Sequence, residues 1–172
     1  MPPIHEQFMR EAIAVAHQGL GQGELPIGAV VVLDDEIVAT SYTKELSQGR
    51  LLVHAELLAL DAADKILGAR RREALLYTTL EPCLMWLGAA FSANIGTVVY
   101  ALESPTDGAV EVSATWDRGR DAAGLPYHRL PKVIGGVLRA ESGALFRKYD
   151  EGAKRSDWLV KWANNLAVLT EG

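Results

Sequence analysis

Cysteine is almost absent from this chain of 172 residues, since Cys83 is the only one. A single cysteine excludes an intrachain disulfide, a CxxC redox pair and a four-cysteine zinc knuckle, and it fits a reducing compartment. Apolar runs of the roughly 18 to 20 residues that cross a bilayer are also missing. The first 20 residues hold no basic segment followed by an apolar one. We therefore expect a cytoplasmic protein that does not cross a membrane.

An excess of positive charge is missing as well. The 17 Lys and Arg residues stand against 22 Asp and Glu residues, which gives a formal net charge of −5. Such a chain repels polyanions as a whole, so binding to a nucleic-acid backbone needs a local basic patch. Arg70–Arg72 forms one basic cluster, but a solvated run of charge in a connecting segment is its simpler interpretation.

Apolar sequence is what the chain has in quantity, with 49% hydrophobic and 23% charged residues. Its length suits one domain over residues 1–172, with 140–172 as C-terminal helices. The periodicities predict a mixed sheet with helices packed on it. In chain order the expected elements are a helix at 5–18, strands at 27–33 and 37–42 joined by Asp34-Asp35, a helix at 53–67, a strand at 75–79, a helix from Glu81-Pro82 to 93, strands at 97–102 and 133–138, and helices at 140–152 and 156–169.

Two short segments carry residues suited to metal chemistry. His54-Ala55-Glu56 opens one predicted helix, and Pro82-Cys83 opens the next. Imidazole and thiolate are good zinc ligands, and a carboxylate two residues from the imidazole can stay off the metal and move protons. The helix dipole also favours the thiolate form of a cysteine at a helix N-terminus. The two helix starts are therefore expected to meet at one edge of the sheet.

With these two segments the sequence resembles the zinc-dependent nucleobase and nucleoside deaminases, whose signature is H-x-E followed by P-C-x-x-C. Leu25–Val30, Thr78–Cys83 and Leu87–Ala89 resemble the flanks of that signature. The resemblance covers roughly residues 6–102, and it is closest to the small cytosine, guanine and tRNA-adenosine deaminases. It implies an α/β fold of three layers, the cytidine deaminase-like fold, whose mixed central sheet of about five strands carries helices on both faces.

The resemblance also implies roles for single residues. His54 and Cys83 would bind zinc, and Glu56 would shuttle protons in a hydrolytic deamination. The backbone N–H groups of Ala55 and Cys83 would help to hold the reacting oxygen and the base. Thr43 stands eleven residues before His54, where this branch usually has a substrate-binding asparagine. A hydroxyl cannot copy a two-sided amide, so the substrate is expected to differ from those of the familiar branches.

Trp86 departs from the family's pattern, because it stands where the second cysteine of P-C-x-x-C belongs. An indole has an N–H donor and no lone pair for a metal. His17, His128 or Asp107 could replace the missing ligand only if the fold brought one of them in. Two protein ligands alone would hold zinc weakly, since catalytic sites normally use three. Packing into the core is the simpler interpretation of Trp86.

Two functions stay open at this point. The first is a hydrolase, a zinc-dependent deaminase of a nucleobase, nucleoside or related heterocycle whose metal site is compromised by Trp86. The second is a non-catalytic deaminase-fold protein that binds a ligand or a partner. The charge favours a small heterocycle over nucleic acid, and the apolar stretch Leu84–Phe91 favours a homodimer. Trp158 and Trp162 are expected to pack in the core, with cover of a pocket as the alternative.

Overall fold

The computed structural model describes residues 3–116, 129–150 and 156–171. In chain order its elements are α1 (Pro3–Gly21), β1 (Gly28–Leu33), β2 (Glu36–Tyr42), α2 (Glu45–Gln48), α3 (Ala55–Leu67), the 3₁₀ helix η1 (Gly68–Glu73), β3 (Leu75–Leu80), α4 (Leu84–Ser92), β4 (Thr97–Leu102), α5 (Val110–Ala114), β5 (Lys132–Ile134), α6 (Arg139–Asp150) and α7 (Asp157–Val168).

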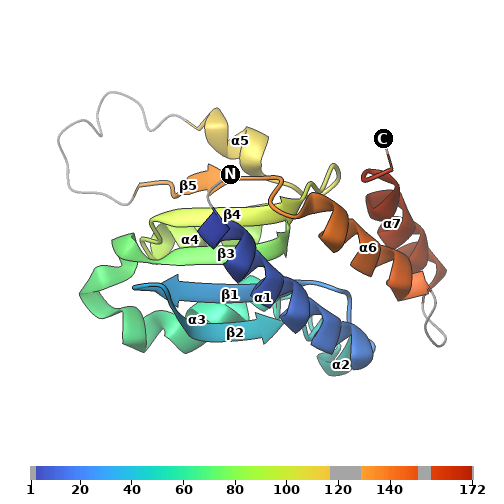
Figure 1. Cartoon of the computed structure of the whole chain (residues 1–172), viewed down its shortest axis with the longest axis horizontal. Coiled ribbons are helices and arrows are strands. Elements are labelled where there is room, and N and C mark those ends of the chain that lie inside the picture. Colours follow the sequence, from blue (N-terminus) through green and yellow to red (C-terminus); the bar gives the residue numbers. More distant parts are fainter. Residues whose placement is uncertain (1–2, 117–128, 151–155, 172) are drawn as a thin grey trace.

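The strands form one five-stranded sheet in the order β2-β1-β3-β4-β5 (Figure 1). β1 runs antiparallel to both β2 and β3, whereas β3, β4 and β5 run parallel to one another. The hairpin between β1 and β2 turns at Asp34 and Asp35, whose φ angles of 55° and 60° suit the twist of a tight hairpin. The predicted mixed sheet and its acidic hairpin turn are therefore confirmed.

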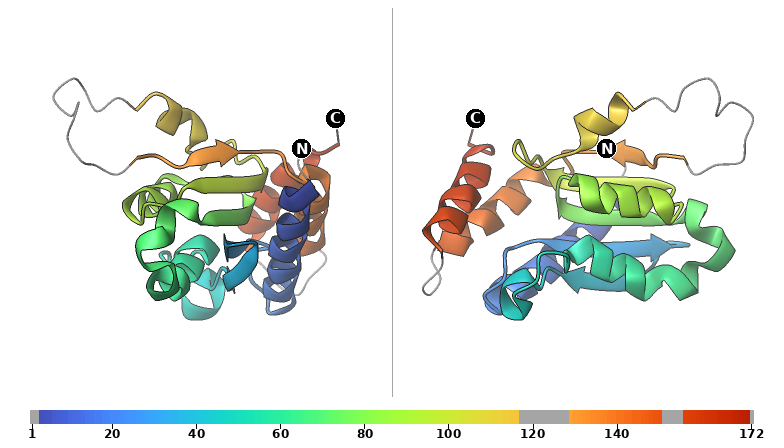
Figure 2. Two further views of the ribbon diagram at one scale, coloured as in Figure 1. Left: turned by 60° about the vertical axis from the view of Figure 1, so that its left-hand side comes forward. Right: turned by 180° about the vertical axis from the view of Figure 1, so that it is seen from behind.

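Helices cover both faces of this sheet. Val30 and Val32 of β1 pack with α1, and the intervening Val31 packs with α3, as the alternation of side chains along a strand requires. A Cβ on Gly28 would lie 2.5 Å from the Ala12 carbonyl oxygen, so glycine permits the close approach of α1. Figure 2 shows α3 and α4 on the face opposite α1. The three-layer arrangement expected from the resemblance is confirmed.

One end of the sheet gathers the segments that carry the motif. β2, β3 and β4 finish there, and α2, the starts of α3 and α4, and the α6–α7 pair follow at the same end (Figure 1). Residues that are far apart in sequence therefore meet beyond the carboxyl ends of β3 and β4, where open α/β sheets commonly bind ligands.

Several element boundaries differ from the expected ones. The fifth strand spans Lys132–Ile134 instead of 133–138, because Gly136 and Leu138 adopt positive φ angles of 81° and 56° that end the extended backbone. The helices expected from residues 53 and 81 begin at Ala55 and Leu84. The short elements α2, η1 and α5 were not predicted, since four to six residues are too few to show a helical period.

Candidate active site

His54 and Cys83 hold equivalent positions, each immediately before a helix on the same face of the sheet. His54 is the N-cap of α3 and Cys83 is the N-cap of α4, both with extended backbone. The Sγ atom of Cys83 lies 3.8 Å from Nδ1 of His54. The structure thus brings together the two side chains that the resemblance assigns to the metal.

Glu45 lies on the other side of the His54 ring, and no sequence motif pointed to it. Its Oε1 lies 3.5 Å from Nε2 of His54, and its Oε2 accepts a hydrogen bond from the Thr43 hydroxyl at 3.0 Å. The contacts with Cys83 and Glu45 raise the pKa of His54 to about 10. Because a histidine binds a metal as the neutral imidazole, metal binding here has to displace that proton.

Glu56 sits in the first turn of α3 and is only 2% exposed. Its Oε1 accepts a hydrogen bond of 2.6 Å from the Thr78 hydroxyl at the centre of β3. Its Oε2 is buried and has no hydrogen-bond partner among the described residues. Burial raises the pKa of this carboxyl above its usual range, against the opposing effect of the Thr78 hydrogen bond. The group is therefore positioned and still has an oxygen to offer to a ligand.

Trp86 is 2% exposed, belongs to the core under α3 and also lines the cavity described below. Within residues 3–116, 129–150 and 156–171, no three His, Cys, Asp or Glu side chains come together to hold a metal ion. Asp107 lines the cavity, whereas His17 is exposed on α1. His128 lies outside the described residues. One imidazole and one thiol do not fit the three-donor set of a catalytic zinc.

Thr43, Ala55 and Cys83 are the three predicted substrate contacts, and all of them line one cavity together with His54 and Glu56. Thr43 is buried at the end of β2, and its backbone N–H donates to the Ile27 carbonyl at 3.1 Å. With its hydroxyl hydrogen directed to Glu45, Thr43 can offer a ligand only acceptor lone pairs. Ala55 opens α3, where the first backbone N–H groups have no partner within the helix.

One cavity of about 820 Å³ is lined by the residues just placed at this end of the sheet, namely Thr43, Glu45, His54, Ala55, Glu56, Cys83 and Trp86. Its lining combines the segment before β1, the residue after β2, α2 and the loop that follows it, the starts of α3 and α4, the end of β3, the loop between β4 and α5, and α7. Ser104 follows β4 and lines the cavity as well. Its Oγ, like Oε2 of Glu56, is buried and has no hydrogen-bond partner among the described residues. Neither Ser104 nor Glu45 stands in a recognisable motif, so only the fold reveals that they share a cavity with His54.

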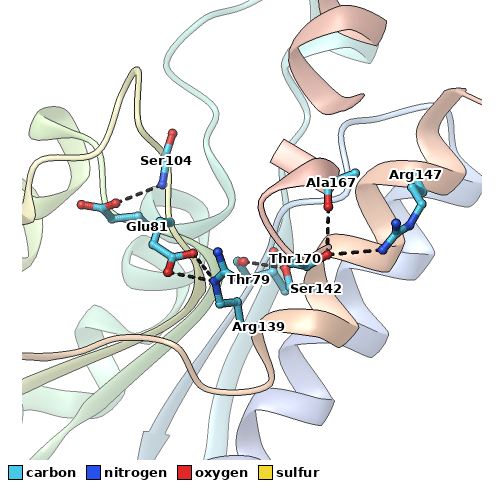
Figure 3. A network of polar contacts seen from close by, with 9 residues as sticks. Thr79, Glu81, Ser104, Arg139, Ser142, Arg147, Ala167 and Thr170 are labelled. Carbon is cyan, nitrogen blue, oxygen red and sulfur yellow. Dashed lines mark hydrogen bonds and ion pairs between the residues drawn. The ribbon is translucent and has the colours of Figure 1, made fainter. Parts of the chain in front are cut away.

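Helix α7 closes the cavity with Trp158, Leu159 and Trp162. The α6–α7 pair is anchored at the sheet end shown in Figure 3, where the Ser142 hydroxyl donates to the Thr79 carbonyl at 2.7 Å and Arg139 pairs with Glu103. Figure 3 also shows Arg147 and Ala167 joined through Thr170, which links α6 to the end of α7. These contacts set the position of the wall that α7 provides.

The cavity is acidic. Glu45, Glu56, Glu81 and Asp107 line it, against Arg50 and His54. The carboxylate of Glu81 binds backbone groups: it accepts hydrogen bonds from the Ser104 N–H at 3.0 Å and from the Val110 N–H at 3.2 Å. Glu81 therefore holds the loop after β4 in place and does not face a ligand with both oxygens.

Arg70–Arg72 lie outside this cavity, and each of the three side chains binds nearby groups of the protein. Arg70 pairs with Asp34 and Glu73, and Arg71 pairs with Asp64. Arg72 donates to the Asn94 side chain and to a backbone carbonyl. The interpretation of this run as a solvated charged segment agrees with these pairings. Among the described residues, no helix is long and apolar enough to cross a membrane.

Comparison with known proteins places the chain among deaminases. Residues 2–102 match the cytidine and deoxycytidylate deaminase zinc-binding region. A tRNA-specific adenosine deaminase from Bacillus subtilis is 34% identical over 145 residues, which cover 84% of this chain and 87% of the relative. A guanine deaminase from the same organism is 39% identical over 101 residues, which cover 58% of this chain and 65% of the relative.

A solved structure agrees with the sequence comparison. It comes from work on A-to-I editing by tRNA:A34 deaminases at the wobble position of transfer RNA, and it superposes with a TM-score of 0.67 at 34% identity. The match covers 81% of this chain and 98% of that chain. The likeness extends beyond the region of the sequence motif and includes the sheet described above.

Proposed function

This chain belongs to the cytidine and deoxycytidylate deaminase zinc-binding family, and from that premise we propose that its cavity takes up a nucleobase, nucleoside or related heterocycle on a scaffold built for hydrolytic deamination. One observation carries the proposal: His54 and Cys83 meet at 3.8 Å in the same cavity as Glu56, whose buried Oε2 has no partner among the described residues. Hydrolytic deamination replaces an exocyclic amino group by oxygen from water and releases ammonia.

Glu56 is the proton carrier in this proposal. Its raised pKa lets the carboxyl group hold a proton at a higher pH than an ordinary glutamate does, as suits general acid and base catalysis near neutrality. The Thr78 hydroxyl fixes Oε1, which leaves Oε2 to exchange a proton with a ring nitrogen of the bound heterocycle. The first backbone N–H of α3, at Ala55, and the lone pairs of Thr43 orient the ring.

Trp86 limits the chemistry of this chain. His54 and Cys83 are two of the three donors that a catalytic zinc requires, and the indole cannot be the third. We propose that the chain as it stands binds zinc substoichiometrically and deaminates poorly. The non-catalytic alternative, in which the cavity only binds a ligand, is favoured by the same residue, because Trp86 is fully packed into the core.

Metal analysis separates these alternatives. The native chain, Trp86→Cys and Trp86→Ser are equilibrated with equimolar zinc, desalted and analysed for metal. Because Ser removes the same bulk without adding a thiolate, only Trp86→Cys is expected to approach one zinc per chain and to release ammonia from a base or nucleoside. Full zinc occupancy of the native chain would show that another donor has replaced the missing cysteine.

The charges of the cavity support a small heterocycle over a nucleic acid. A polynucleotide needs several Lys or Arg contacts to phosphate, and the cavity offers Arg50 and His54 against four carboxylates. Two of the relatives act on tRNA or guanine by name, so both substrate sizes occur in the family. Trp86→Cys is expected to release ammonia from free bases or nucleosides and to leave adenosine in RNA and cytosine in DNA unchanged. Editing of RNA or DNA without turnover of any small compound would contradict this choice.

We also propose a homodimer. Leu84 is exposed at the start of α4, and the Leu84–Phe91 stretch has no charged residue. Burying such a surface against a second copy removes apolar area from water. Light scattering at micromolar concentration is expected to report twice the chain mass of 18.6 kDa, and a mass of one chain would contradict the dimer.

A further inference from the structure

Trp158 and Trp162 lie one turn apart on α7, and their surroundings differ. Trp162 is fixed, because its Nε1 donates to the Thr106 hydroxyl at 3.2 Å and its ring meets Phe146 edge-on at 5.9 Å. Trp158 is 66% exposed although it lines the cavity. Among the described residues, no hydrogen bond or ring contact is made by Trp158. Packing in the core, which was expected for both tryptophans, is wrong for Trp158.

The position of Trp158 does not result from a loosely packed helix. Leu159, Ala163, Leu166 and Ala167 of α7 are buried in the core. The neighbouring Leu159 lines the cavity beside Trp158. The buried apolar residues of α7 and the contacts of Trp162 therefore hold the helix in place, and the Trp158 indole lies at the cavity wall. Covering such a large exposed aromatic surface with a flat apolar surface lowers the free energy of the complex.

The rest of the cavity specifies the chemistry of that flat surface. Glu56 Oε2 and Ser104 Oγ are two buried oxygens without partners among the described residues, and both belong to residues that line the cavity. A ligand that satisfies them needs hydrogen-bonding groups at its edge. A ligand that covers Trp158 needs an apolar, planar face. A nitrogen heterocycle with exocyclic polar groups has both features, and base-on-aromatic stacking tolerates many ring types.

We propose that Trp158 is the stacking residue of the cavity, covering one face of the heterocycle whose edge is bound by Glu56 and Ser104. The inference rests on the proposed function for the class of ligand, and it adds a binding residue outside the deaminase motif. Trp162, held by Thr106 and Phe146, keeps α7 in position and does not stack on the ligand.

Calorimetric titration of the native chain with adenine, guanine, cytosine, adenosine and cytidine identifies the tightest of these probes. With that probe, Trp158→Ala is expected to weaken binding by about tenfold or more, the scale of lost stacking on one aromatic side chain. Trp158→Phe keeps a ring and is expected to stay within about threefold of the native affinity. The matched control is Trp116→Ala, which removes an indole that is 49% exposed and does not line the cavity; its affinity is expected to equal that of the native chain.

Fluorescence gives an independent readout that a purely structural role would not change. The chain has four tryptophans, and if Trp158 stacks on the probe, saturation quenches the native emission much more than that of Trp158→Phe. Unchanged affinity in Trp158→Ala, or equal quenching in Trp158→Phe and the native chain, would overturn the stacking role alone. Failure of the native chain to bind any of the five compounds would overturn this inference and the proposed ligand class together, whereas ammonia release by Trp86→Cys tests the deaminase scaffold separately.

Discussion

The two sides of the cavity are built in different ways. The side formed by the starts of α3 and α4 holds the buried Glu56, which the hydroxyl of Thr78 on the central strand β3 fixes in place. The side formed by α7 offers an exposed indole on a helix that is held by contacts with distant parts of the chain, such as Trp162 with Thr106. The first side holds the groups that we propose to react, and the second offers contact area to the proposed ligand.

The largest expected effect lies on the reactive side. In the Trp86→Cys background, Glu56→Gln is expected to lower turnover by at least about a hundredfold, the scale of a lost general acid or base. Zinc content is expected to stay the same, because glutamine keeps the shape and Glu56 is not a proposed ligand. Steady-state ammonia release and metal analysis of the two variants check this. A mild loss of turnover would assign proton transfer to another group.

We expect a tryptophan on each side of the cavity to contribute differently to stability. Trp86→Ala is expected to lower the free energy of unfolding by about 3–5 kcal/mol, since it leaves a cavity in the core. Trp158→Ala is expected to change it by less than about 0.5 kcal/mol, because the side chain is largely in water. Urea unfolding of both variants measures the difference. Equal destabilisation by the two substitutions would mean that Trp158 is a core residue and would remove the contrast between the two sides.

We expect the free energy of unfolding to depend on pH through His54. Its pKa is raised from 6.5 to about 10 by Cys83 and Glu45. Between these two values the folded chain binds more protons at this site than the unfolded chain, so the contribution of His54 to stability is full below pH 6.5 and is lost as the pH rises toward 10.

Glu45→Gln tests that cause, because it removes the charge facing Nε2 and keeps the shape. The variant is expected to be roughly 1 kcal/mol less stable than the native chain at pH 6 and nearly equal to it at pH 10. The common background from other titrating groups cancels in this difference. Urea unfolding at both pH values checks it, and a difference that does not depend on pH would contradict the role of Glu45.

An effect of similar, small size is expected at the anchor of the α7 side. Ser142→Ala removes the buried 2.7 Å hydrogen bond to the Thr79 carbonyl, and it is expected to lower the free energy of unfolding by about 1 kcal/mol. Ser142→Thr, which keeps the hydroxyl, tests whether the hydrogen bond or the volume matters. Faster hydrogen exchange in α6, with unchanged exchange at the start of α3, would show that the anchor acts on this side of the cavity only.

The sequence predicted the deaminase fold well where local patterns repeat. The alternating apolar residues around Asp34-Asp35 predicted the hairpin, and the H-x-E and P-C segments predicted which residues would open two neighbouring helices. Elements of four to six residues were missed, and these include α2, which carries Glu45 to the edge of His54. Such short segments show no period, so their position depends on partners such as the buried Glu24 carboxylate, which accepts from the Leu46 and Ser47 N–H groups.

By itself the sequence determined the family, the two helix starts and the substitution at Trp86, because each depends on residue type at a fixed spacing along the chain. Only the tertiary structure decided that Glu45 meets His54, that Ser104 joins Glu56 in one cavity, and that Trp158 stays in water while Trp162 is held. The physical reason is that these positions depend on how separate elements pack at one end of a sheet, and no local pattern records which side chains will meet there.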